Sequence, residues 1–90
     1  MKSISNLKTK NRIFLAPMEE VNDIAFRLLC KTAGCGMTYT GMICPLTQQE
    51  INLEDSPILQ LFCASEDGIK EFIEKYEDKV SGWDFNLGCP

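Results

Sequence analysis

The chain has 90 residues, of which 44% are hydrophobic and 24% charged, and its formal net charge is −4. This length allows one small domain, and an acidic total without a Lys/Arg cluster argues against a nucleic-acid-binding surface here. No apolar run approaches the roughly 18 residues of a membrane span, and the N-terminus does not predict a signal peptide, so we expect a cytoplasmic protein with no membrane partner.

The cysteines predict reduced thiols rather than disulfides or a metal centre. There are five of them and no histidine, and the odd number without a secretory signal is typical of a reducing compartment. No C-x-x-C pair occurs, so neither zinc nor iron–sulfur ligation is indicated, and we expect no metal. Four cysteines are interpreted as small buried apolar residues; these are Cys30, Cys35, Cys44 and Cys63.

Strands and helices are expected to alternate along the chain. Residues 1–11 are polar and irregular and predict an N-terminal arm. Apolar runs rich in β-formers predict four strands, at 12–18, 37–40, 58–62 and 83–87. Segments with helical spacing or capping signals predict three helices between them, at 22–34, 44–52 and 65–80.

Each predicted helix has its own start signal. Asn22 or Asp23 can cap the first, Pro45 suits the first turn of the second, and Ser65 can cap the third. Gly34 is a suitable stop for the first helix. The apolar stripes expected to face the core are Ile24, Ala25, Leu28 and Leu29 in the first helix, and Ile69, Phe72, Ile73 and Tyr76 in the third.

This alternation predicts an α/β fold built from parallel βαβ units. An open doubly wound sheet and part of an eight-stranded barrel both fit the order of elements. A dinucleotide-binding Rossmann domain is disfavoured, because "APMEEVND" stands where G-x-G-x-x-G would follow the first strand.

Polar and turn-forming residues gather where the predicted strands end. In parallel α/β sheets those ends line the active site. Here they are Pro17, Met18, Glu19, Thr40, Gly41, Met42, Asn86, Gly88 and Cys89. Gln60 is a polar residue within an apolar strand, and a buried amide needs hydrogen-bond partners. A planar heteroaromatic ring with alternating donors and acceptors would supply them.

Four segments resemble, in order and spacing, the N-terminal half of the tRNA-dihydrouridine synthases. They are "FLAPMEEVNDIAFRLLCKTAG", "YTGMI", "LQLFCASED" and "DFNLGCP". In that family the first four strands end in or carry motifs close to A-P-M, T-E-M, V-Q-L and N-x-G-C-P. Three positions depart from the family pattern: Asn22 replaces the usual Thr, Gly41 stands where Glu is frequent, and Cys63 stands where Gly is common.

The resemblance implies that residues 12–90 are the N-terminal half, about four βα units, of an FMN-binding TIM barrel. The parent enzyme would reduce uridine to 5,6-dihydrouridine in tRNA with NAD(P)H as electron donor. Family members bind tRNA and the flavin phosphate through parts that this chain lacks. We therefore expect a fragment truncated after the fourth strand and inactive by itself, or one half of a split barrel with a second half-barrel chain as partner.

The resemblance also assigns roles to six residues. Cys89 would be the general acid that gives a proton to uracil C5. A thiol suits this role, because its usual pKa of about 8.5 leaves it protonated at neutral pH yet able to release the proton. The implied cofactor-binding residues are Pro17, Met18 and Glu19 along the isoalloxazine, Gln60 at its pyrimidine edge, and Asn86 on flavin or uracil.

Two alternatives remain open from the sequence. Another FMN-dependent barrel oxidoreductase, such as a dihydroorotate dehydrogenase, carries a similar N-x-S-C-P motif in which the Cys acts as a base. The "APM…F-R" start and Gly88 favour the synthase. The second alternative is a catalytically inactive half-barrel that serves as a binding or assembly module.

Overall fold

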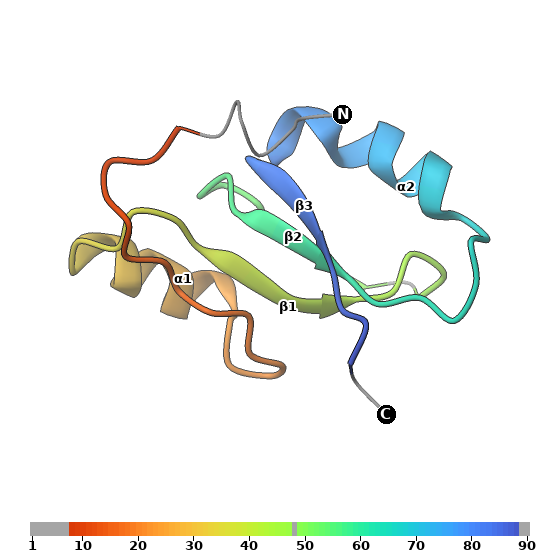
Figure 1. Ribbon diagram of the computed structural model, residues 1–90, viewed down its shortest axis with the longest axis horizontal. Coiled ribbons are helices and arrows are strands. Elements are labelled where there is room, and N and C mark those ends of the chain that lie inside the picture. Colours follow the sequence, from red (N-terminus) through yellow and green to blue (C-terminus); the bar gives the residue numbers. More distant parts are fainter. Residues whose placement is uncertain (1–7, 48, 89–90) are drawn as a thin grey trace.

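A three-stranded parallel sheet with two α-helices forms the part of the chain that the computed structural model describes, residues 8–47 and 49–88 (Figure 1). The elements in chain order are α1 (Ile24–Thr32), β1 (Tyr39–Ile43), β2 (Ile58–Leu61), α2 (Ile69–Tyr76), the 3-10 helix η2 (Glu77–Lys79) and β3 (Gly82–Phe85). The strand order is β1-β2-β3. In Figure 1, α2 lies along β2 and β3, and α1 lies beside β1.

The apolar core lies between the sheet and α2. All four residues of the central strand β2 are buried. Leu59 and Leu61 are fully buried and form the core cluster with Ile43, Leu53 and Val80. The predicted stripe of α2 packs against this cluster and comprises Ile69, Phe72, Ile73 and Tyr76. Because side chains alternate along a strand, Gln60 points to the opposite face of the sheet.

The strand expected at 12–18 forms only a single parallel bridge, between Phe14 and Met37. The Leu15 N–H also donates to the Met37 carbonyl over 2.9 Å. The ladder does not continue, because Pro17 has no N–H to donate. This segment therefore has the position and direction of a strand next to β1 without becoming part of the sheet.

Asn22 joins this segment to β1 through its side chain. Its Nδ2 donates to the Ala16 carbonyl over 2.8 Å and to the Tyr39 carbonyl over 2.9 Å. Asp23, the second residue considered as a cap, is the actual N-cap of α1, and its carboxylate accepts the Phe26 N–H over 2.8 Å. Asn22 thus bridges two backbone segments rather than capping the helix.

The helix expected at 44–52 is wrong: the described residues there form a turn and irregular backbone. The Thr47 N–H donates to the Cys44 carbonyl over 3.1 Å, which closes one turn. Farther along, the Asn52 carbonyl accepts a hydrogen bond from the Arg27 guanidinium. That distant contact favours an irregular path over a continuous helix.

The helix expected at 65–80 is correct in type but begins later, at Ile69. Ser65 does not cap it; its hydroxyl accepts the Asp67 N–H over 3.3 Å and closes a preceding turn. The residue directly before the helix is Gly68, whose φ of 79° lies in the left-handed region that glycine adopts readily.

Helix α1 ends as expected but does not bury the predicted stripe. Gly34 follows the helix with a φ of 109°, and its N–H donates to the Lys31 carbonyl over 3.0 Å. Leu28 and Leu29, however, are 39% and 64% exposed. The buried residue of α1 is Arg27.

A buried ion pair explains why this helix turns an arginine inward. Arg27 Nε donates to Asp55 Oδ2 over 3.0 Å, and Nη2 donates to Oδ1 over 3.0 Å. The guanidinium also donates to the carbonyls of Asn22, over 2.8 Å, and Asn52. The Thr38 hydroxyl donates to the same Asp55 carboxylate over 2.6 Å. One ion pair therefore joins α1, the loop before β2 and the residue before β1.

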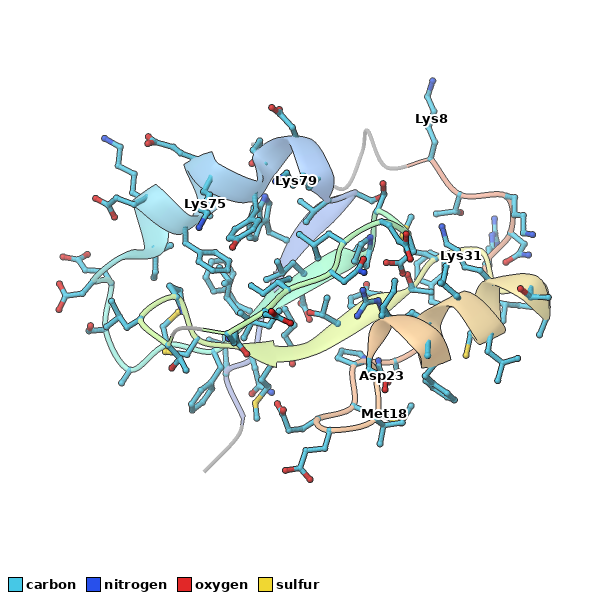
Figure 2. All side chains as sticks on the ribbon, turned by 180° about the vertical axis from the view of Figure 1, so that it is seen from behind. Lys8, Met18, Asp23, Lys31, Lys75 and Lys79 are labelled. Carbon is cyan, nitrogen blue, oxygen red and sulfur yellow. The ribbon has the colours of Figure 1, made fainter. Side chains whose placement is uncertain are left out.

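Lys31 adds a second link from α1 to that loop. Its Nζ donates to the Asp55 carbonyl over 3.0 Å. Figure 2 shows Lys31 directed from α1 toward the middle of the molecule, whereas Lys8 points outward from the N-terminal segment.

Cys30, Cys35, Cys44 and Cys63 are free, as expected for reduced thiols, but the expectation that they are buried is wrong, because all four are only partly buried. The backbone N–H of Leu46, followed by the Thr47 hydroxyl, stabilises the thiolate of Cys44 and lowers its pKa. Burial raises the pKa of Cys63, and the nearby Cys44 thiolate raises it further. These two thiols therefore differ in reactivity.

Neither α-helix of the described residues is long and apolar enough to cross a membrane. Across residues 8–47 and 49–88, no group of three or more His, Cys, Asp or Glu side chains is arranged to hold a metal ion.

Removing one partner of the buried ion pair is expected to destabilise the fold strongly. Arg27→Ala leaves the Asp55 carboxylate buried without its cation, which costs about 3–5 kcal/mol. Urea unfolding of the 90-residue chain measures the loss. The control Leu29→Ala lies on the exposed side of α1 and should change stability by about 0.5 kcal/mol or less. Equal effects of the two substitutions would contradict the structural role of the pair.

Cys44 is expected to react with iodoacetamide faster than Cys63 near neutral pH. The thiolate is the nucleophile, so a lowered pKa enlarges the reactive fraction and a raised pKa reduces it. As pH rises, labelling of Cys44 should therefore increase at lower pH than labelling of Cys63. Peptide mass spectrometry after timed labelling measures both rates, and faster labelling of Cys63 would contradict the assignment.

Candidate functional site

The carboxyl ends of the three strands meet at one edge of the sheet. The register places Met42 beside Gln60, and Gln60 beside Asp84. Paired residues of neighbouring strands project to the same face, so these three side chains share the face opposite α2. The edge predicted from the sequence therefore exists for β1, β2 and β3.

Gln60 is a buried polar residue of this edge, with 7% of its surface exposed. Its Nε2 donates to Asp84 Oδ2 over 2.8 Å, and its Oε1 accepts from Asn86 Nδ2 over 3.3 Å. Its backbone N–H donates to the Thr40 hydroxyl over 3.0 Å. The partners that a buried amide requires are thus supplied by the protein, and Gln60 and Asn86 are brought into contact.

Asp84 is a site residue that the sequence analysis did not identify. The signal was present, because Asp84 and Asn86 are two residues apart at a strand end and polar residues at that spacing share one face. Asp84 also acts on Tyr39: burial raises the pKa of the Tyr39 hydroxyl, and the Asp84 charge adds to the increase.

The segment of Pro17, Met18 and Glu19 is held at the end of β1 by a tight turn. The Met18 carbonyl accepts the N–H groups of Val21 and Asn22, each over 3.2 Å. Figure 2 shows Met18 and Asp23 close together at the start of α1. The predicted cofactor-binding segment is thus fixed in place, with the Met18 carbonyl occupied by the turn.

Gly41 allows this segment to approach β1 closely. A Cβ on Gly41 would lie 3.1 Å from the Met18 carbonyl oxygen and 3.3 Å from Glu19 Cα. Such contacts are tighter than ordinary van der Waals packing and involve backbone atoms. A side chain at this position would therefore press against the backbone of Met18 and Glu19.

Cys89, the predicted general acid, lies outside the described residues, as does Pro90. The chain leading to it is anchored on the sheet edge. The Asn86 N–H donates to the Leu61 carbonyl over 2.8 Å, and the Gly88 N–H donates to Asn86 Oδ1 over 3.0 Å. Cys89 is thus the residue that follows an anchored turn.

A cavity of about 1120 Å³ lies elsewhere, between the start of α1, β1 and residues 49–54. Four of the predicted strand-end residues line it, namely Glu19, Thr40, Gly41 and Met42, whereas Gln60, Asp84 and Asn86 do not. Residues 49–52 of its lining belong to the segment 44–52, which was expected to be a helix. We place the candidate site at Gln60, Asp84 and Asn86, because Gln60 is hydrogen-bonded to both of the other side chains.

The face around Gln60 suits a flat heterocycle with one polar edge. Tyr39 pairs with Ile58, two residues before Gln60, and its ring centroid lies 6.5 Å from that of Phe14, so the two rings supply apolar surface. An amide carries two donors and two acceptor positions, so Gln60 keeps one N–H and one lone pair beyond its bonds to Asp84 and Asn86. A flavin matches this combination, since its ring system is planar and its pyrimidine edge alternates donors and acceptors.

Gly41→Ala is expected to destabilise the chain by about 1–3 kcal/mol, because the added methyl overpacks the Met18–Glu19 backbone. The control is Gly82→Ala, whose Cβ meets only Ile58 Cγ1 at 3.8 Å, and which should be neutral or stabilising by up to about 1 kcal/mol. Urea unfolding compares the two. If both variants match the parent chain, the close approach at Gly41 does not constrain the segment.

Comparisons with known proteins agree with the resemblance. The family model described as "Dihydrouridine synthase (Dus)" matches residues 14–90. A "Probable tRNA-dihydrouridine synthase" of Helicobacter pylori strain J99 is 35% identical over 98 aligned residues, which cover 94% of this chain and 30% of the relative. A protein of the same name from Rickettsia prowazekii strain Madrid E is 31% identical over 103 aligned residues, covering 100% of this chain and 32% of the relative.

The "tRNA-dihydrouridine synthase B" of Pasteurella multocida is 45% identical over 40 residues, which cover 44% of this chain and 12% of that protein. No solved structure matches the chain. The chain spans about 30% of the length of the first Helicobacter relative. Because the family model covers most of the chain, and two relatives more than 30% identical match nearly all of it, the chain belongs to the dihydrouridine synthase family.

Proposed function

We propose that this chain provides the flavin-contacting edge and the proton donor of a tRNA-dihydrouridine synthase. One observation carries the proposal: Gln60 and Asn86 are hydrogen-bonded at the sheet edge, and Asn86 stands three residues before Cys89 in the sequence. In the enzyme, uridine in tRNA would be reduced to 5,6-dihydrouridine, with FMN as cofactor and NAD(P)H as electron donor.

The proposed architecture is the first part of a TIM barrel. The order β1-β2-β3 follows the chain, and the Phe14–Met37 bridge adds the preceding segment on the outer side of β1. Barrel strands neighbour one another in chain order, whereas doubly wound sheets reverse direction at a switch point. The described order shows no reversal and supports the barrel. Elements beyond this chain would complete it, and a second half-barrel chain is one source of them.

The cofactor-binding roles follow from the position of each residue. Gln60 would use its remaining N–H and lone pair on the pyrimidine edge of FMN, and Asn86 would lie between Gln60 and the substrate. Pro17, Met18 and Glu19 would flank the ring from the end of β1. When bound and reduced, FMN supplies a hydride for uracil C6.

Cys89 would complete the reduction by giving its proton to C5 of the uracil. Its position directly after the Asn86–Gly88 turn would place the thiol at the carboxyl edge of the sheet, where Gln60 and Asn86 lie. Gly88 is exposed, and an added Cβ would meet no atom within 4 Å, so the loop has room for a substrate. The proposed partner is tRNA, held by parts outside this acidic chain, in the cytoplasm.

Cys89→Ala is expected to separate flavin reduction from uridine reduction. The assay uses a chimaera in which residues 14–90 replace the matching segment of the Helicobacter pylori J99 relative. Flavin binding and flavin reduction by NAD(P)H should remain near the parent level, since neither involves the C5 proton. Oxidation of the reduced flavin by tRNA should slow by about 10²–10⁴-fold, as expected for loss of a positioned acid.

Cys63→Ala in the same chimaera is the matched control and should affect packing alone. Stopped-flow absorbance of the flavin follows both half-reactions. A Cys89→Ala variant that reduces uridine at the parent rate would eliminate Cys89 as the acid, even though the family membership would stand.

A further inference from the structure

We infer that Asp84 is a positioning residue that fixes the orientation of the Gln60 amide and thereby sets which groups Gln60 offers to a bound flavin ring. The part that names the flavin rests on the proposed function. The orientation itself rests on the hydrogen bonds of three side chains at the sheet edge.

The first constraint comes from Asp84. A carboxylate only accepts hydrogen bonds, whereas a glutamine amide has a donating and an accepting end of nearly the same shape. The contact of 2.8 Å with Asp84 Oδ2 is therefore favourable only when the Gln60 nitrogen faces it. An inverted amide would place two oxygens against each other in a largely buried position.

The second constraint comes from Asn86 and agrees with the first. Asn86 Oδ1 accepts the Gly88 N–H over 3.0 Å, which leaves the amide nitrogen of Asn86 facing Gln60. The hydrogen bonds then run in one direction, from Gly88 through Asn86 and Gln60 to Asp84. Bonds aligned in this way polarise one another, so the carboxylate determines the orientation of the whole row.

The donor and acceptor that Gln60 has left determine which groups of a ligand it can bind. One N–H of Nε2 and one lone pair of Oε1 are left after the bonds to Asp84 and Asn86. The amide would thus donate to a ring carbonyl on the Asp84 side and accept from a ring N–H on the Asn86 side. Inverting Gln60 would exchange these two positions and oppose the same ring edge.

The orientation can be tested in the 90-residue chain by NMR of ¹⁵N-labelled glutamine side chains, with Gln60→Ala assigning the Gln60 signals. Asp84→Asn keeps the side-chain shape but can present either an oxygen or an NH₂ group to Gln60. Asp84→Ala removes the partner. Both substitutions should move the Gln60 amide protons upfield. Asp78→Asn, which removes a charge from an exposed residue of η2, should leave them unchanged. Unchanged signals in Asp84→Ala would overturn the inference.

The consequence for the cofactor is tested in the chimaera described above. Asp84→Ala and Gln60→Ala should each weaken FMN binding about tenfold, and the double variant should lose little more, because both act through one group. The visible spectrum of FMN bound to Asp84→Asn should shift while the thermal midpoint stays at the parent value.

Losses of affinity that multiply in the double variant would show that Asp84 does not act through Gln60. If the parent chimaera binds no FMN, the proposed function and the flavin part of the inference both fail. The NMR experiment then still decides whether Asp84 orients Gln60.

Discussion

The buried ion pair of Arg27 and Asp55 is the contact on which the arrangement of the strands depends. A guanidinium removed from water costs several kcal/mol unless it is paired and hydrogen-bonded, and here one carboxylate and two backbone carbonyls accept its hydrogen bonds. Thr38, directly before β1, binds the same carboxylate, which stands three residues before β2. The pair therefore sets the start of β1 against β2, where Tyr39 pairs with Ile58. The register shifts between Tyr39 and Met42, and Met42 then pairs with Gln60 at the candidate site.

At the candidate site, a central position of the sheet that an apolar side chain could fill is occupied by the amide side chain of Gln60. β2 is buried along its whole length, so a leucine in place of Gln60 would need no partner. Gln60 instead requires Asp84 and Asn86, and losing either would leave a buried polar group at a cost of about 1–3 kcal/mol. Polar groups arranged in this way at a strand end are typical of a binding site, because they break the local apolar pattern.

Sequence patterns predicted the elements whose signals are local. The stripe of α2, the Asp23 cap and the Gly34 stop all depend on residues within a few positions, and the structure confirms them. One failure was local, since Ser65 closes a turn with Asp67 instead of capping α2. Another depends on a distant contact: Arg27 is buried because Asp55, 28 residues away, pairs with it. Asp84 was missed although it stands two residues before Asn86; its hydrogen bond to Gln60 depends on the register of β2 and β3, which no local pattern shows. The roles of Cys89, Gln60, Asn86 and Pro17–Glu19 stay predictions.

The exposed apolar groups of the described residues fit the barrel proposal. Leu28 and Leu29 of α1 face outward, and Phe14 lies on a segment with one bridge to its neighbour. Burying a leucine side chain contributes about 1.5–3 kcal/mol. Helices and strands added along these sides would therefore stabilise the fold by covering its exposed apolar side chains. The polar face around Gln60 would at the same time become the interior of the barrel. Stability of this part and completion of its flavin site would then depend on the same added elements.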